Sequence, residues 1–175
     1  RARAEEVRAA SITAVHLPRD GMPALGDNPL FLGCADYRST IASNVESSGF
    51  TFPEEMRRHA DKGTALVTDK DPGDAEIAEV VSQAAAHSCI VLGTYNGHIL
   101  QGQLRLAKAL AATGLPLILV ALRNPYDLRN MPDHVATLAG WEYTRPLFDA
   151  LWPVLNGTAR PTGKLPLLTL TKAAE

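Results

Sequence analysis

Two glycine-flanked stretches have the spacing of loops that carry out chemistry in other proteins. Residues 93–97, GTYNG, match the Gly-x-Ser-x-Gly turn of serine hydrolases, but Tyr95 takes the place of the serine. A phenol ionises only at strongly alkaline pH and is a poor acyl-transfer nucleophile. Residues 157–164, GTARPTGK, resemble a phosphate loop, but five residues rather than four separate the glycines, and Leu165 follows where a magnesium-binding hydroxyl is needed. The sequence therefore predicts a sharp turn at 93–97, but neither a serine hydrolase nor a nucleotide site.

Polar residues gather where each predicted strand ends. The clusters are Asp36-Tyr37-Arg38, Thr68-Asp69-Lys70, Thr94-Tyr95-Asn96-Gly97-His98, Arg123-Asn124-Pro125-Tyr126 and Trp141-Glu142. Because the carboxyl ends of parallel strands share one edge of a sheet, and ligands bind in the crevice there, we expect these clusters to meet in space. The alternative is that loops are polar in any protein and that Asn124-Pro125 only turns the chain.

One turn and one histidine stand out at this edge. Pro125 excludes a helical conformation at Asn124, which should leave Arg123 and Asn124 beside Tyr95, Asn96 and Asp36. Of the histidines considered, only His98 lies among these residues and could contact a ligand, although it could equally be an ordinary loop residue. We interpret His87 as the end of a helix and His134 as a loop residue.

The elements that must position these clusters follow from the hydrophobic pattern. Short apolar runs alternate with longer segments of helical period, which is typical of an α/β fold with a mainly parallel sheet covered on both faces. The predicted strands are 30–34, 65–68, 89–93, 117–122 and 135–139. We therefore expect a three-layer α/β sandwich with five or six strands in a flavodoxin-like arrangement. The unbroken apolarity of 117–122 predicts a central strand buried on both faces.

Helices are predicted between the strands. Apolar residues recur at helical spacing over 74–87 and 97–113, and Gly114 suits the left-handed residue that closes a helix. A last helix should begin after Thr144 as N-cap, contain Pro153 and stop at Asn156-Gly157. The first ten residues, RARAEEVRAA, predict an amphipathic helix rather than a signal peptide. We expect surface loops at 17–28 and 160–166.

Composition excludes several classes of function. The chain has 175 residues, enough for one domain with a sizeable core, and its net charge is −2 with scattered Lys and Arg. We therefore expect neither a nucleic-acid nor a membrane partner, and no apolar run reaches the length of a membrane span. Cys34 and Cys89 are too few for a zinc site or a disulfide framework, and both lie in apolar runs, which predicts core thiols.

Four stretches carry a resemblance to a known family. They are AASITAV at 9–15, VLGTYN at 91–96, VALRNPYDL at 120–128 and NGTARPTGKLPL at 156–167. With them the chain resembles, over nearly its whole length, the C-terminal domain of family-3 glycoside hydrolases. The Gly-Lys-Leu-Pro tail is shared widely across that family, whereas the LRNPYD turn and the VLGTYN strand end indicate its β-N-acetylglucosaminidase-like branch.

The resemblance implies a partner and a substrate. In that family an N-terminal TIM-type barrel carries the aspartate nucleophile and, in this branch, a His–Asp pair as general acid/base. This sequence contains no such barrel and begins with Arg1, so we expect a fragment of a longer protein, with the barrel as its partner and a carbohydrate as substrate. Other branches place an acid/base glutamate on the C-terminal domain. Glu142 is the only glutamate at a predicted strand end, although this branch does not use one.

The resemblance thus implies no catalytic residue in this chain and no metal or cofactor. The residues expected to contact the substrate or the barrel are Asp36, Tyr95, Asn96, His98, Arg123, Asn124 and Tyr126. A second hypothesis is a stand-alone flavodoxin-like module that binds a small ligand or acts as a sensor. A flavin or phosphate site there would need a Gly/Ser/Thr-rich loop facing a helix N-terminus, and only 93–97 comes close. The preferred sugar, the oligomeric state and the cellular compartment stay open.

Overall fold

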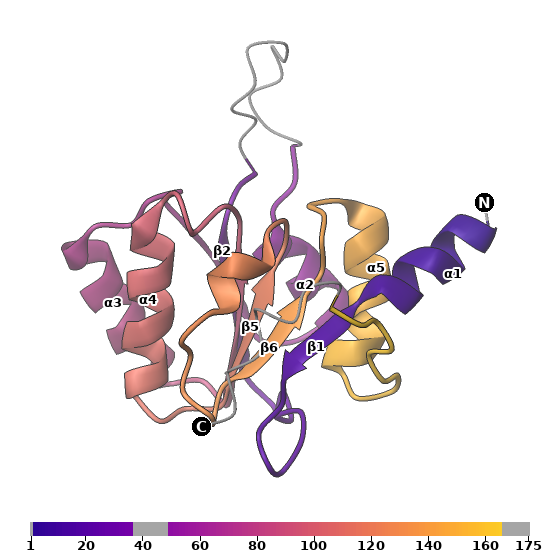
Figure 1. Cartoon of the computed structure of the whole chain (residues 1–175). Coiled ribbons are helices and arrows are strands. Elements are labelled where there is room, and N and C mark those ends of the chain that lie inside the picture. The colour runs from indigo at the N-terminus through magenta and orange to yellow at the C-terminus, as the bar shows by residue number, and fades with distance from the viewer. Residues whose placement is uncertain (1, 37–48, 166–175) are drawn as a thin grey trace, which may run out of the picture.

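Six strands form one sheet at the centre of the molecule (Figure 1). The structure is a computed structural model, and it describes residues 2–36 and 49–165. The strands are β1 Thr13–His16, β2 Pro29–Cys34, β3 Thr64–Thr68, β4 Cys89–Thr94, β5 Leu117–Ala121 and β6 Ala136–Ala139. Tyr37 and Arg38 of the first polar cluster, and Pro166 and Leu167 of the C-terminal motif, lie outside the described residues.

The sheet is parallel except at one edge. The strand order is β1-β6-β5-β4-β2-β3, and every pair is parallel except β1 with β6. Counted among themselves, the five parallel strands have the order 2-1-3-4-5 of flavodoxin-like sheets. The expected mainly parallel, flavodoxin-like α/β sheet is therefore confirmed. The prediction missed β1, because its four residues, TAVH, contain too short an apolar pattern to indicate a strand before β6 pairs with it.

The central strands are buried on both faces. Every residue of β2, β4 and β5 is buried, as predicted for 117–122. Alternate side chains enter two separate cores: Val91 and Ile118 contribute to one, and Ile90 and Leu119 to the other. Strands covered on both faces need apolar side chains at every position, which explains the unbroken apolar runs.

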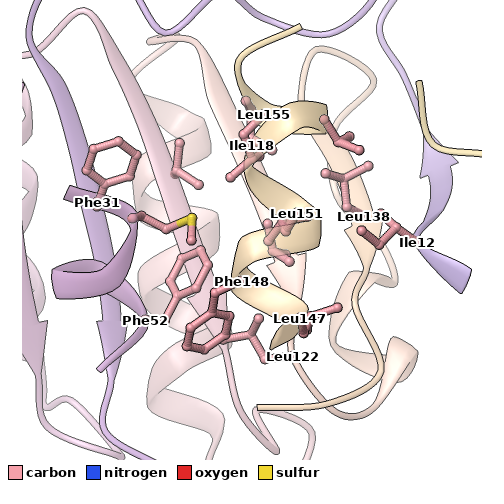
Figure 2. Close-up of a cluster of buried hydrophobic side chains, with 14 of the residues drawn as sticks. Ile12, Phe31, Phe52, Ile118, Leu122, Leu138, Leu147, Phe148, Leu151 and Leu155 are labelled. Carbon is pink, nitrogen blue, oxygen red and sulfur yellow. The ribbon is translucent and has the colours of Figure 1, made fainter. Parts of the chain in front are cut away.

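Helices cover both faces of the sheet (Figure 1). Their bounds are α1 Ala2–Ser11, α2 Phe52–Ala60, α3 Asp74–Ala84, α4 Gln101–Ala112, the 3-10 helix η1 Pro125–Leu128, and α5 Arg145–Leu155. Residues of α2 and α5 share one core, and residues of α3 and α4 share the other. Figure 2 shows Phe52 of α2 and Phe148 of α5 in the first core, where their ring centroids lie 5.4 Å apart.

Helix α2 was not predicted, although its sequence contains a start signal. Thr51 caps it: the side-chain oxygen accepts a hydrogen bond from the Glu54 N–H at 3.4 Å, and the hydroxyl donates to the Glu54 carboxylate at 2.6 Å. Thr-x-x-Glu is the sequence pattern of a capping box, although here the Glu54 carboxylate accepts from the Thr51 hydroxyl and not from its backbone N–H. The helix is short, but it buries Phe52 and Met56 completely against the sheet.

The predicted helix boundaries were right at some ends and wrong at others. Thr144 caps α5, since its side-chain oxygen accepts from the Leu147 N–H at 3.3 Å. Gly114 has a φ of 75°, the left-handed value expected where the preceding helix closes. Helix α3 ends at Ala84, three residues before the predicted end, because His87 turns back and its Nδ1 lies 3.2 Å from the Asn28 carbonyl.

The N-terminal helix corrects the expectation of an amphipathic segment. Helix α1 forms as predicted and lies beside α5 (Figure 1), yet none of its residues is buried. It therefore has no apolar face packed on the described part of the chain. Its C-terminal end is held instead by Trp141, whose indole N–H donates to the Ser11 carbonyl at 2.9 Å.

Replacing Phe148 tests the core between the sheet and α5. Phe148 is fully buried, and its ring packs against Phe50, Phe52 and Tyr143. We expect Phe148→Ala to lower the free energy of unfolding by about 3–5 kcal/mol, because it leaves a cavity that these rings cannot fill. The control Phe148→Leu should cost clearly less. Urea denaturation followed by circular dichroism measures both, and a loss below about 1 kcal/mol for the alanine variant would contradict the packing.

The two cysteines provide a second test. Cys34 and Cys89 are buried free thiols, as predicted, and burial raises the pKa of each to about 12. At pH 8 we expect no reaction of the folded chain with an aromatic disulfide reagent, and reaction of both thiols after denaturation. Because the folded state holds these protons more tightly, the free energy of unfolding should fall as pH rises from about 9 towards 12. Rapid labelling of native protein would show that the thiols are accessible.

Candidate functional site

The carboxyl edge of the sheet collects the predicted site residues from three strands. Asp36 follows β2, Tyr95 and Asn96 follow β4, and Arg123 follows β5. In the flavodoxin-like order, β2 and β4 flank the point where the strand order reverses, which is where open α/β sheets bind ligands. The edge is therefore the position that the fold favours for a site.

Tyr95 and Arg123 meet at this edge, as expected. The Arg123 guanidinium donates a hydrogen bond to the Tyr95 hydroxyl oxygen at 3.2 Å, and its carbon lies 5.6 Å from the Tyr95 ring centroid. Tyr95 is buried and packs edge-on against Tyr143 at 5.3 Å, whereas Arg123 is exposed. A rigid aromatic cluster thus supports a cationic side chain at the surface.

Tyr143 is a structural residue of the edge that sequence reasoning missed. Its hydroxyl donates to the Cys34 carbonyl at 3.0 Å and accepts from the Phe52 N–H at 2.8 Å. Burial raises the pKa of this phenol, so it remains neutral and can both donate and accept. The hydroxyl joins the end of β2 to the start of α2, partners 109 and 91 residues away in sequence, and no local pattern reveals such contacts.

Two buried carboxyl groups lie near the ends of β2 and β5. Asp36 is 5% exposed and Asp127 is fully buried. Both contribute to the raised pKa of the Cys34 thiol, after the larger effect of burial, because negative charge nearby disfavours the thiolate. Asp127 was not among the predicted site residues, although it belongs to the RNPYD turn.

Asp127 shapes the loop after β4. Its Oδ2 accepts from the Gly97 N–H at 2.9 Å, and its Oδ1 accepts from the His98 N–H at 2.7 Å. Asn96 adopts a left-handed φ of 57°, so the chain makes the sharp turn that the GTYNG stretch predicted. The same turn corrects the predicted helix 97–113, because α4 begins only at Gln101. A side chain at Gly97 would bring its Cβ within 3.1 Å of Asp127 Oδ2.

Asn124 is extended, as Pro125 requires, with φ −123° and ψ 120°. Its side-chain oxygen accepts from the Tyr126 N–H at 3.2 Å and caps η1. This contact fits the alternative that Asn124 braces the turn.

Tyr126 is 39% exposed; its ring lies 6.2 Å from the His98 ring, and the Arg129 guanidinium lies 4.6 Å above it. His98 and Tyr126 are therefore neighbours at the surface.

Glu142 lies apart from these contacts. It forms an ion pair with Arg8 of α1, and the adjacent Trp141 has a left-handed φ of 73°. Both residues line an open groove of about 710 Å³ between α1 and the loop after β6. Glu142 is thus held by a cation on the N-terminal helix.

Metal and membrane features can be assessed for the described residues alone. Within 2–36 and 49–165, no group of three or more His, Cys, Asp or Glu side chains could hold a metal ion. No helix in those ranges is both long enough and apolar enough to cross a membrane.

Several solved glycoside hydrolases contain a region similar to this chain. A family-3 β-N-acetylglucosaminidase from Paenibacillus sp. str. FPU-7 matches with a TM-score of 0.77 and 26% identity, over 95% of this chain and 32% of that one. A fungal multi-domain family-3 β-N-acetylglucosaminidase matches with a TM-score of 0.73 and 17% identity, over 98% and 19%. A β-glucosidase from Listeria innocua matches with a TM-score of 0.72 and 17% identity, over 94% and 26%.

The chain spans about a third or less of the length of these enzymes. No protein-family model matches the chain, and no curated protein sequence matches it. The similarity extends over nearly the whole chain, and one of the matching enzymes is a β-N-acetylglucosaminidase, the type that the sequence motifs indicated. The chain therefore resembles a domain-sized part of family-3 glycoside hydrolases, including a β-N-acetylglucosaminidase.

Proposed function

We propose that the chain is the C-terminal accessory domain of a retaining, β-N-acetylglucosaminidase-like glycoside hydrolase. The observation that carries the proposal is the match to the Paenibacillus enzyme, at 26% identity over 95% of this chain. Because that match covers only 32% of the enzyme, the proposal includes a catalytic TIM-type barrel elsewhere in the parent protein. The substrate class is terminal β-linked N-acetylglucosamine or a related β-glycoside.

The partners of three carboxylates in the domain argue against a role of these groups in bond cleavage. A retaining glycosidase needs two groups about 5–5.5 Å apart, one to attack and one to protonate the leaving group. In this chain Asp127 accepts backbone hydrogen bonds, Glu55 is held by two arginines, and Glu142 pairs with Arg8. Carboxylates with such partners are engaged in structure, so we assign hydrolysis to the barrel.

The same geometry disfavours the second hypothesis, a stand-alone flavin- or phosphate-binding module. Such a site would use the free N–H groups of the loop after β4 and of the N-terminus of α4. Those of Gly97 and His98 already donate to Asp127, and that of Gly102 donates to Asp71 at 2.6 Å. An anionic ligand would have to displace the buried Asp127 carboxylate and the exposed Asp71 carboxylate from these groups.

Activity should depend on the barrel. We expect the chain alone not to hydrolyse an aryl N-acetyl-β-glucosaminide above the buffer rate, and the chain joined to its barrel to do so. Turnover of a chromogenic substrate measures this, with a barrel variant lacking the nucleophile as control. Hydrolysis by the isolated chain that Glu142→Gln abolishes would contradict the proposal and place the acid/base on this domain.

Arg123 and Asn124 separate a binding role from a structural one. In the chain joined to its barrel, we expect Arg123→Ala to lower kcat/KM about tenfold, or ~1.4 kcal/mol of transition-state binding, at an unchanged melting temperature. Asn124→Ala should instead lower the melting temperature, because it removes the cap of η1.

Lys108→Ala is the matched control for Arg123→Ala, since it removes one exposed positive charge from the middle of α4. It should change neither kcat/KM nor the melting temperature. An unchanged kcat/KM in Arg123→Ala would contradict a role in substrate binding and would mean that the Arg123–Tyr95 contact is only structural.

A further inference from the structure

His98 is oriented by a buried carboxylate. Asp127 is fully buried, and its Oδ1 lies 3.2 Å from His98 Nδ1 while accepting the His98 backbone N–H at 2.7 Å. A carboxylate can only accept hydrogen bonds, so the contact requires a proton on Nδ1. In the neutral imidazole, Nε2 is then left with its lone pair and acts as a hydrogen-bond acceptor.

The acceptor atom has no partner in the described part of the chain. Residues 2–36 and 49–165 contribute hydrogen bonds to the backbone N–H and to Nδ1 of His98, but none to Nε2. The His98 side chain is 30% exposed. One edge of the ring is therefore fixed by Asp127, and its other nitrogen is available at the carboxyl edge of the sheet.

The surroundings of His98 restrict what it can bind. Two exposed side chains flank it, Ile99 at 66% and Tyr126 at 39%, and the Arg129 guanidinium lies over the Tyr126 ring. Positive charge on Arg129 opposes the binding of a cation. Nε2 cannot bind an anion, because its lone pair accepts hydrogen bonds and an anion requires a hydrogen-bond donor. The site therefore favours a neutral ligand with hydroxyl or amide N–H donors and an apolar side to lie on the Tyr126 ring.

We propose that His98 Nε2, Tyr126 and Ile99 form a subsite for a neutral sugar unit, with Asp127 as the residue that sets the tautomer of His98. The subsite deepens the proposed function and rests on it for the choice of sugar. His98 contacts the ligand directly, whereas Asp127 acts through His98 and is a positioning residue. Neither breaks a bond.

The tautomer is tested first, on the 175-residue chain. Long-range ¹H–¹⁵N spectra distinguish a protonated Nδ1 from a protonated Nε2. We expect His98 to be the Nδ1–H tautomer in the wild type, and Asp127→Asn, if circular dichroism shows it folded, to lose that preference. Should Asp127→Asn unfold, the wild-type tautomer and the binding of sugar by His98→Phe and His98→Gln still decide the proposal, because both variants retain the backbone N–H that Asp127 binds. An Nε2–H tautomer in the wild type would overturn the proposal.

Binding is tested second, with N-acetylglucosamine and its β-1,4-linked disaccharide as probes. We expect saturable shifts of the His98 ring and of the Ile99 and Tyr126 amides, and a dissociation constant at least tenfold weaker in His98→Phe. His98→Gln, which offers an acceptor oxygen, should bind better than His98→Phe. His87→Phe, a change at a histidine outside the edge, is the matched control and should bind like the wild type. Equal binding by His98→Phe, or no saturable shift, would overturn the subsite.

These outcomes are separable from those of the proposed function. Hydrolysis gained on joining the barrel, together with no sugar binding at His98, would overturn the subsite and leave the accessory-domain role intact. Sugar binding at His98 without any gain of hydrolysis would overturn the accessory-domain role and leave the subsite intact.

Discussion

Burial of β2, β4 and β5 on both faces is the constraint on which the rest of the structure depends. Since every residue of these strands is buried, the chain must return between successive strands through segments that cover one face or the other. Parallel strands connected in this way end at one edge. That edge receives every loop that follows a parallel strand, so residues far apart in sequence become neighbours there. The strands are apolar because they are buried, and the edge is polar because the loops that follow them reach the surface there.

Long-range polar contacts then give the edge a definite shape. The Tyr143 hydroxyl joins the end of β2 to the start of α2, and the Asp127 carboxylate holds the loop after β4. Each contact satisfies backbone groups that burial would otherwise leave unpaired. The same contacts use up N–H groups that an anionic ligand would require. Among the described residues, Arg123, one nitrogen of His98 and the half-exposed ring of Tyr126 reach the surface at this edge.

Such an edge is suited to assisting a reaction more than to carrying it out. Its buried Asp127 carboxylate is held by backbone N–H groups, and its exposed groups include a cation, an acceptor nitrogen and an aromatic ring. On the proposed function, these groups would orient a sugar or a barrel loop while the chemistry proceeds on another domain. The similarity to enzymes several times longer than this chain is consistent with catalysis on another domain.

Local sequence patterns predicted the fold class, five of the strands and the cap of α5, because these features depend on periodicity and on side chains within a few residues of one another. They also indicated that the polar clusters share an edge, since strand direction decides that. The pairing of β1 with β6, the roles of Asp127 and Tyr143, and the contact of Glu142 with Arg8 became visible only in the folded chain. The physical reason is sequence separation: each of these contacts joins residues about 30 or more positions apart, and no local pattern encodes them.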